Sequence, residues 1–405
     1  MARKRLAVVY DLGSATPLEI RSAVGRACDV VFVCDLDLPH VAAAVPVIRQ
    51  FAEIVDVTGM ELDQRIKAVE ASTPDGVVTF SEYRLGEASA YTTALGLPGH
   101  SPETVAVLTD KLAQRRALAA VQPVGCAVVG DDPAAALAVA GLPAVLKPRS
   151  GAGSLHTTQV DTEDELHAAL QAVPDGDFVL ETLLVGDSSV AGEAWGDYVS
   201  VESVHTPAGS RQVCVTGKFP LAEPFRETGM LLPATLSEVD TAAVLALDSA
   251  ATAALGVRYG ITHTEIKLTA DGPRVIEVNG RLGGYVPGIL RQATGINLVQ
   301  VAVQIALGLE PRWQEIRWRG VTYQYFLTPF ESGTVQALEG ADEVSGFDGV
   351  LKVDVQARPG DVVDWRGGTQ AHLGVVHGTA PDHDTLRRTA ERIGQTFRPV
   401  FQENS

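Results

Sequence analysis

The sequence predicts a mixed α/β and α+β protein in which an N-terminal parallel sheet precedes a larger central domain and a β-rich C-terminal portion. Short apolar runs alternate with helical segments over residues 1–100, which is typical of a parallel sheet with flanking helices. Residues 262–279 carry a strong β-hairpin pattern, and after about residue 310 short strands and turns dominate. A length of 405 residues indicates more than one domain. We expect domains at 1–100, 101–310 and 311–405.

The N-terminal elements follow from the spacing of apolar residues. The Val- and Ile-rich runs read as buried parallel strands, and the segments between them have helical spacing. We expect strands at 6–10, 30–34, 54–57 and 76–80, and helices at 17–27, 41–51 and 61–70. No GxGxxG motif follows the first strand, so dinucleotide binding is not supported. Sites in such sheets lie beyond the carboxyl ends of the strands, which places Asp11 and the cluster 81–84, with Glu82, at an expected ligand mouth. The alternative is that these residues cap helices and form a surface salt bridge.

The later elements are fewer and are separated by Gly- and Pro-rich turns. Residues 96–99 form a linker, and one helix follows it with Ser101 or Thr104 as cap and with Asp110, Lys111, Arg115 and Arg116 on its polar side. An Ala-rich helix over 238–256 ends at a glycine. We expect further strands at 143–148, 178–183, 197–204, 321–327 and 351–355, and a last helix at 383–396.

Composition and charge exclude several classes of protein. Lys and Arg total 32 against 50 Asp and Glu, so the net charge is −18, and a nucleic-acid partner is disfavoured. The four cysteines form no CxxC pair, which is typical of a reduced, cytoplasmic protein. No stretch approaches the roughly 20 apolar residues of a membrane span, so no membrane partner is expected.

The predicted hairpin is formed by residues 262–268 and 274–279. An Asp-Gly turn between two alternating runs is a strong hairpin signal. If the turn centres on Asp271, Glu265 lies opposite Glu277 and His263 lies opposite Asn279.

This pairing predicts a metal site. Two opposed carboxylates destabilise a sheet by up to about 1 kcal/mol, and a divalent cation between them would reverse that effect. Carboxylate and amide oxygens suit Mg²⁺ or Mn²⁺, so we expect Glu265, Glu277 and Asn279 to be the ligands. A register slip of one residue would separate the two glutamates. The alternative is a solvated polar face, which the neighbouring Val and Ile residues disfavour.

A glycine-rich segment follows Asn279 directly. Gly283 and Gly284 let the backbone approach an anion, and Arg281 can pair with phosphate or substrate oxygens. Since Mg²⁺ is usually held by one or two carboxylates together with substrate phosphates, this segment points to a nucleoside triphosphate.

A second candidate site begins at Lys147, which needs an anionic partner if it is buried on its strand. The loop after it is not a P-loop, but its backbone N–H groups can fold over phosphates. Its residues are Ser150, Gly151, Gly153 and Ser154. Downstream, Glu181, Leu183 and Leu184 offer a carboxylate and backbone groups for an adenine, and Asp187 offers an acceptor for a ribose hydroxyl.

Taken in order along the chain, these motifs resemble the ATP-grasp superfamily. They are Lys111 in Thr-Asp-Lys-Leu, Lys147 in Val-Leu-Lys-Pro, the glycine-rich loop, Glu181, Glu265, and Glu277 in Glu-Val-Asn-Gly-Arg. The segments 263–269 and 277–284 are similar to the amino-acid ligase and carnosine-synthase-like branch. The resemblance covers the whole chain: a pre-ATP-grasp domain, a two-subdomain ATP-grasp core and a β-rich, lid-like C-terminal portion.

The resemblance implies that ATP lies between two α+β subdomains, with Lys111 and Lys147 on its phosphates. Glu181, Leu183 and Leu184 would form the adenine hinge, and Asp187 stands where the family more often has Glu. Two Mg²⁺ (or Mn²⁺) ions would bind Glu265, Glu277 and Asn279. Arg281 would hold the acyl-phosphate region.

The implied activity is ADP-forming ligation of a small-molecule carboxylate, such as an amino acid, to an amine through an acyl phosphate. Lys147 and Arg281 would neutralise charge, and His263 and Glu82 are candidates for the base or for ammonium recognition. Such ligases are often homodimers. The alternatives are another ATP-grasp ligation, such as amide formation on a non-amino-acid carboxylate or a cyclisation, and a non-catalytic nucleotide sensor.

Overall fold

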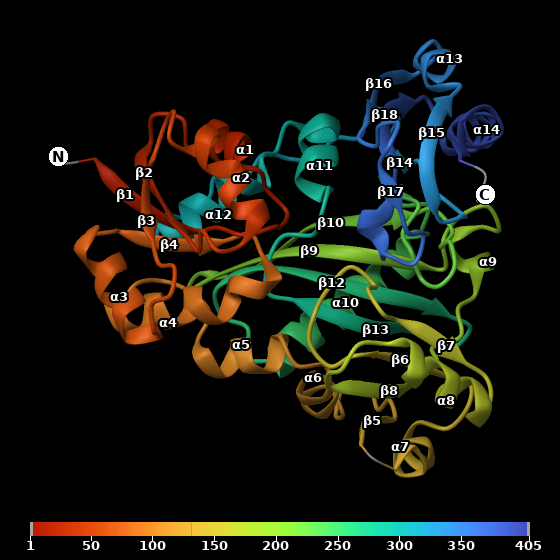
Figure 1. Cartoon of the computed structure of the whole chain (residues 1–405), viewed down its shortest axis with the longest axis horizontal. Coiled ribbons are helices and arrows are strands. Elements are labelled where there is room, and N and C mark those ends of the chain that lie inside the picture. Colours follow the sequence, from red (N-terminus) through yellow and green to blue (C-terminus); the bar gives the residue numbers. More distant parts are fainter. Residues whose placement is uncertain (1–2, 131, 403–405) are drawn as a thin grey trace.

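The computed structural model describes residues 3–130 and 132–402. The chain begins with the predicted four-stranded parallel sheet, and the order of its strands is β3-β2-β1-β4 (Figure 1). Its strands are β1 (Lys4–Val9), β2 (Cys28–Cys34), β3 (Glu53–Asp56) and β4 (Gly76–Thr79). The connecting helices are α1 (Pro17–Val24), α2 (Pro39–Ile48) and α3 (Leu62–Ala71), and the short helix η1 (Glu82–Arg84) and α4 (Leu85–Leu95) follow β4.

A helix from much later in the sequence completes this N-terminal layer. Helix α12 (Leu298–Ala306) packs against α1 and β4 (Figure 1). A Cβ on Gly76 would lie 2.3 Å from the carbonyl oxygen of Ala306, so this position requires glycine. Lys4 also donates from Nζ to the carbonyl of Leu307 at 2.7 Å. The N-terminal domain is therefore not confined to residues 1–100.

The linker is followed by two short helices, α5 (Pro102–Leu108) and α6 (Lys111–Ala117), where one helix was predicted. Ser101 caps α5 as expected, but the side chain of Asp110 accepts from the backbone N–H groups of Leu112 and Ala113 and starts a new helix. The prediction that Arg115 lies on a polar face is wrong, because its side chain is buried.

The strand of Lys147 belongs to a separate small antiparallel sheet in the order β5-β8-β6-β7. Its strands are β5 (Cys126–Val129), β6 (Ala144–Pro148), β7 (Thr158–Val160) and β8 (Phe178–Thr182). Helices α7 (Pro133–Ala140) and α8 (Glu163–Ala172) cover it, and an apolar cluster that includes Leu146, Leu166 and Leu180 forms its core.

The hairpin lies at one edge of an eight-stranded sheet in the order β13-β12-β9-β10-β11-β14-β18-β16. The strands are β9 (Tyr198–Thr206), β10 (Gly209–Lys218), β11 (Gly229–Leu232), β12 (Gly260–Thr269), β13 (Gly272–Asn279), β14 (Val321–Phe326), β16 (Val350–Val355) and β18 (Gly374–Ala380). The predicted boundary at residue 310 thus runs through one continuous sheet.

The remaining elements surround this sheet. Helix α10 (Glu238–Ala254) packs on β13, and α11 (Val286–Thr294) packs on β14. The β-rich C-terminal region contains α14 (His383–Thr396), the last helix, which was predicted at these residues, and a three-stranded sheet in the order β17 (Val362–Val363), β15 (Gly333–Glu339) and β19 (Arg398–Phe401). Its other elements are α13 (Ala341–Ser345) and η2 (Thr369–Ala371). None of the helices described here has the length and apolar character needed to cross a membrane.

Candidate active site

The hairpin β12–β13 has the predicted pairing of its site residues, but its turn lies at a different position and one strand contains a bulge. Glu265 lies opposite Glu277 and His263 lies opposite Asn279. The turn does not centre on Asp271, because Thr269 pairs with Gly272 across the two residues 270–271. A β-bulge after Glu265 restores the register that brings the two carboxylates to one face.

The donor set on this face fits a hard divalent cation. Glu277 and Glu265 supply carboxylate oxygens, and Asn279 supplies an amide oxygen. The amide nitrogen of Asn279 donates to Glu277 Oε1 at 3.2 Å, which fixes the orientation of this side chain. Burial acts to raise the pKa of Glu277, but the ammonium groups of Lys111 and Lys147 outweigh it and hold that pKa below its ordinary value. In the described part of the chain no three His, Cys, Asp or Glu side chains form a metal cage, so an ion here would complete its coordination with other oxygens, such as the Asn279 amide, water or substrate phosphates.

Arg281 joins the hairpin to the N-terminal domain. Its Nε lies 3.0 Å from Glu82 Oε2, and its Nη2 donates to Asn279 Oδ1 at 3.3 Å. Glu82 comes from η1, beyond the carboxyl end of β4, where a ligand mouth was predicted. Burial raises the pKa of Glu82 although Arg281 opposes that rise. Two of the predicted substrate residues, Glu82 and Arg281, are thus in contact with each other.

His263 is held between two carboxylates. Its Nδ1 hydrogen-bonds to Glu202 on β9, and its Nε2 lies 3.4 Å from Glu265 Oε1. Burial alone would lower the pKa of His263, but Glu202 and then Glu265 raise it to about 9. The imidazole is therefore protonated at neutral pH and has no lone pair for an incoming proton. This environment therefore argues against a general base, and a cationic ring is also a poor partner for a substrate ammonium group.

Lys147 has the anionic partner that its burial demands. Its Nζ donates to Glu181 Oε1 at 2.8 Å, and Arg115 donates to both oxygens of Glu181 at 2.6 and 2.7 Å. Burial would raise the pKa of Glu181, but Arg115 and Lys147 lower it to about 2. Because three hydrogen bonds already occupy this carboxylate, an adenine contact at Glu181 depends mainly on backbone groups.

The glycine-rich loop lies beside the hairpin. Lys111 Nζ donates to the carbonyl of Gly151 at 2.9 Å and lies 3.5 Å from Glu277 Oε2. Gly151 and Gly153 have φ values of 127° and 75°, a region that favours glycine. Thr369 of the C-terminal region donates its backbone N–H to the carbonyl of Gly153 at 3.0 Å. The loop is therefore held from two sides. These contacts involve Gly151 and Gly153, and they do not test the predicted nucleotide contacts of Ser150 and Ser154.

The hinge residues give a mixed picture. Leu183 donates its backbone N–H to Pro143 at 3.2 Å, which leaves Leu184 as the better backbone donor for an adenine. Asp187 accepts from Ser189 and caps the short helix α9 (Ser188–Ala191), so its carboxylate has a structural partner. The ribose contact of Asp187 stays a prediction.

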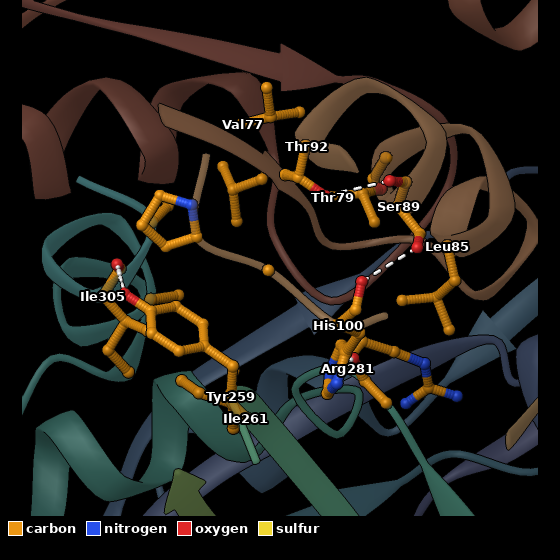
Figure 2. A pocket seen from close by; sticks show the side chains of 18 of the residues that line it. Val77, Thr79, Leu85, Ser89, Thr92, His100, Tyr259, Ile261, Arg281 and Ile305 are labelled. Carbon is orange, nitrogen blue, oxygen red and sulfur yellow. Dashed lines mark hydrogen bonds between the residues drawn. The ribbon is translucent and has the colours of Figure 1, made fainter. Parts of the chain in front are cut away.

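A small apolar cavity of about 80 Å³ lies between the N-terminal domain and the end of the hairpin (Figure 2). Thr79, Ser89, His100, Tyr259 and Arg281 are among the residues that line it. Burial lowers the pKa of His100 to about 4, and its Nε2 hydrogen-bonds to the carbonyl of Gly280 at 3.0 Å. A neutral imidazole therefore supports the backbone next to Arg281.

The structure brings most of the predicted residues together and adds two that were missed. Lys111, Glu277, Asn279, Arg281 and Glu82 form one chain of contacts, and Gly283 lies against the pair of His263 and Glu202. Glu202 and Arg115 were not predicted as site residues. Alternation along 197–204 could have marked Glu202 as inward-facing, but its partner His263 is 61 residues away.

Comparison with known proteins agrees with this geometry. Residues 140–287 match the family model of the ATP-grasp domain, and residues 325–401 match that of the L-amino acid ligase C-terminal domain 2. A solved L-amino acid ligase from Bacillus licheniformis has the same fold, with a TM-score of 0.80, 22% identity and full coverage of both chains.

Two curated relatives extend the comparison. The chain is 27% identical to an uncharacterised protein, y4rH, of Sinorhizobium fredii over 320 residues, which are 75% of this chain and 64% of that protein. It is 21% identical to the L-arginine-specific L-amino acid ligase of Bacillus subtilis over 364 residues, 85% of this chain and 84% of that enzyme. Residues 140–287 thus carry an ATP-grasp domain, and the chain as a whole resembles the L-amino acid ligases.

Proposed function

We propose that the protein is an ATP-dependent, ADP-forming carbon–nitrogen ligase that joins an amino acid, or a related carboxylate, to an amine. The observation that carries this proposal is the opposed pair of Glu265 and Glu277, with Lys111 at 3.5 Å from Glu277 and Arg281 beside Asn279. An arrangement of two carboxylates, an amide and several cations suits a metal-bound triphosphate. The family of the chain and the ligase named among its relatives support the same activity.

The proposed residues divide the work between charge neutralisation and positioning. Lys111 and Lys147 would hold the phosphates, and Arg281 would hold the substrate carboxylate while it accepts the γ-phosphoryl group. Mg²⁺ bound by Glu265, Glu277 and Asn279, with two ions expected from the resemblance, would supply further positive charge at the phosphates.

The acyl phosphate must then meet an amine rather than water. The glycine-rich loop, held by Lys111 and Thr369, would cover the reacting groups and keep water out. Glu82 would recognise the ammonium group of an amino-acid substrate. Its carboxylate contacts the Arg281 guanidinium, so it lies next to the place where Arg281 would hold the carboxylate of the same substrate. Both substrates are expected to be small molecules. A homodimer and a cytoplasmic location remain predictions.

The reaction is tested by measuring ADP and phosphate release with Mg-ATP against amino acids, singly and in pairs, with product masses. Release that needs a particular pair, and a product equal to the pair minus water, would establish the ligase and name both substrates. A product in which a single acid has lost water would indicate a cyclising ligation instead. ATP binding without release across a wide panel of acids and amines would favour the nucleotide sensor.

The metal assignment is tested by Glu277→Ala. We expect substrate-dependent ADP release to fall at least about a thousandfold, because the carboxylate pair is broken where charge develops. The matched control is Asp271→Asn, which removes an exposed carboxylate from the turn of the same hairpin and should leave the rate unchanged. Turnover by Glu277→Ala at the rate of the control would refute the assignment.

A further inference from the structure

The side chains of α6 and of the segment after it take the place of a neighbouring strand along the outer edge of β13. Strand β13 is the last in its sheet, so one side of its backbone has no strand partner. Gln114 donates to the carbonyl of Val278 at 3.0 Å and accepts from its N–H at 2.7 Å. Gln122 accepts from the N–H of Val275 at 2.7 Å. Along this edge, amide side chains form the backbone hydrogen bonds that a neighbouring strand would otherwise form.

Arg115 occupies the part of this edge where the bulge lies. The bulge gives β13 one extra residue, Ile276, between the pairs formed by Val275 and Glu277. Arg115 donates from Nη1 to the carbonyl of Val275 at 2.7 Å and from Nη2 to the carbonyl of Ile276 at 2.6 Å. A single guanidinium therefore holds both carbonyls at the irregular step.

The bulge decides where the Glu277 carboxylate lies. Ahead of it, Lys267 pairs with Arg274 and Ile266 pairs with Val275. If that register continued without an extra residue, Glu277 would lie opposite Thr264, and its side chain would be on the face away from Glu265. The opposition of the two carboxylates thus depends on keeping Ile276 out of the ladder.

The same guanidinium is also linked to Lys147, the proposed phosphate-binding lysine, through Glu181. Nε and Nη2 donate to the two oxygens of Glu181, which in turn accepts from Lys147. The relative exposures of Arg115, Glu181 and Lys147 are 5%, 4% and 6%, so water does not compete for these contacts. Four donated hydrogen bonds in a fixed fork are within the reach of arginine but not of lysine, which has three donors on one atom.

We propose that Arg115 is a positioning residue that fixes the bulge in β13 and thereby the metal-binding geometry of Glu265 and Glu277, while it holds Lys147 through Glu181. The inference rests on the proposed metal site, and Arg115 touches neither nucleotide nor metal in it. A purely structural arginine would affect the stability of the protein only. A positioning arginine also affects metal affinity in molecules that remain folded.

The test measures Mn²⁺ binding to the full-length protein in the presence of ADP, by the electron paramagnetic resonance signal of free Mn²⁺, so that no turnover is needed. The variants are Arg115→Met and Arg115→Lys. The control is Gln122→Leu, which removes a buried hydrogen bond to the same strand but leaves the bulge carbonyls and Glu181 untouched. Circular dichroism and urea unfolding identify temperatures at which each variant is folded.

We expect Arg115→Met to bind Mn²⁺ at least tenfold more weakly than the wild type, Arg115→Lys to be intermediate, and Gln122→Leu to lose stability while it binds Mn²⁺ within twofold. Binding by folded Arg115→Met within twofold of the wild type would overturn the proposal. If Arg115→Met does not fold, Arg115→Lys decides in its place: weakening of threefold or more supports the proposal, and smaller weakening contradicts it.

The same assay separates this inference from the function on which it rests. Wild-type protein that binds no Mn²⁺, or Glu277→Gln that binds it as well as the wild type, would refute the metal assignment itself. Loss of Mn²⁺ binding in Glu277→Gln together with wild-type binding in Arg115→Met would leave the metal site intact and remove only the role of Arg115.

Discussion

Gly283 and Gly284 are neighbours that differ in the space around them. A Cβ on Gly283 would lie 2.4 Å from His263 Nδ1 and 3.0 Å from Glu202 Oε1, whereas a Cβ on Gly284 would meet nothing within 4 Å. The His263–Glu202 pair is buried and cannot move aside easily. Because Gly283 has no methyl group, it leaves room for the hydrogen-bonded pair of His263 and Glu202.

We therefore expect Gly283→Ala to lower the free energy of unfolding by about 1–3 kcal/mol, the usual cost of overpacking a buried site. Gly284→Ala is the matched control and should change it by less than about 0.5 kcal/mol. Urea unfolding followed by tryptophan fluorescence measures both. Equal stability of the two variants would contradict the close approach at Gly283.

The lowered pKa of Glu181 predicts how the free energy of unfolding depends on pH in the acid range. Its pKa of about 2 in the folded protein lies below the ordinary value of 4.5, so its contribution to stability is complete above about pH 4.5 and is lost as the pH falls towards 2. Glu181→Gln should cost about 3–5 kcal/mol at pH 7, because it leaves Arg115 and Lys147 buried without a counter-ion.

The difference in unfolding free energy between wild type and Glu181→Gln should shrink when urea unfolding is repeated at successively lower pH from 4.5 to 2.5. The control is Glu70→Gln, which removes an exposed carboxylate in α3. A wild-type advantage that stays constant down to pH 2.5 would show that Glu181 does not titrate in this window.

At the scale of elements, the glycine-rich loop depends on a turn in the C-terminal region. Gly368 has a φ of 73°, and a Cβ there would lie 2.4 Å from the carbonyl oxygen of Gly153. Thr369 donates to the same carbonyl. A side chain at residue 368 would therefore push the loop away from its docked position.

We expect Gly368→Ala to raise the KM for ATP by about tenfold, since a displaced loop loses part of its contact with the phosphates, worth about 1.4 kcal/mol. Gly360→Ala is a matched control, because Gly360 also has a positive φ, 97°, but has nothing within 4 Å. Initial rates at varied ATP test this. The same KM in both variants would mean that strain, not loop docking, is the only effect.

The hairpin shows what sequence could predict about an element and what it could not. The hairpin and the pairing of Glu265 with Glu277 were predicted correctly, but the pairing was derived from a turn centred on Asp271, and the actual turn gives that pairing only because of the bulge. The bulge at Ile276 was not predicted, because it is stabilised by Arg115, which lies about 160 residues earlier in the chain. The amphipathic reading that placed Arg115 on a polar face failed for the same reason: its partners come from other elements.

At the scale of the whole molecule, the order of strands and helices was largely predictable, and the long-range contacts between them were not. The parallel sheet, the strand of Lys147 and α14 follow from local apolar patterns. The return of α12 to the N-terminal sheet and the continuation of the large sheet through β14 and β18 are long-range pairings. Nothing in the residues near 100 or 310 encodes these contacts.

The packing of α12 predicts that residues 1–100 do not form a stable domain alone. Without α12, the apolar face that includes Leu6 and Ile20 loses its partners Val301 and Ile305. An expressed 1–100 fragment should bind a hydrophobic dye strongly and lack a cooperative thermal transition, unlike the full chain. A sharp transition in the isolated fragment would show that α12 is not needed.

The glutamine and arginine side chains along β13 have one further consequence for the molecule in a crowded solution. An uncovered edge strand is a template on which another chain can pair, and such pairing leads to aggregation. Hydrogen bonds from Gln114, Arg115 and Gln122 occupy backbone groups of β13, so another strand cannot pair with that edge. At the far edge, β16 bears the exposed charges of Lys352 and Asp354. The residues that shape the candidate active site therefore also protect the sheet against self-association.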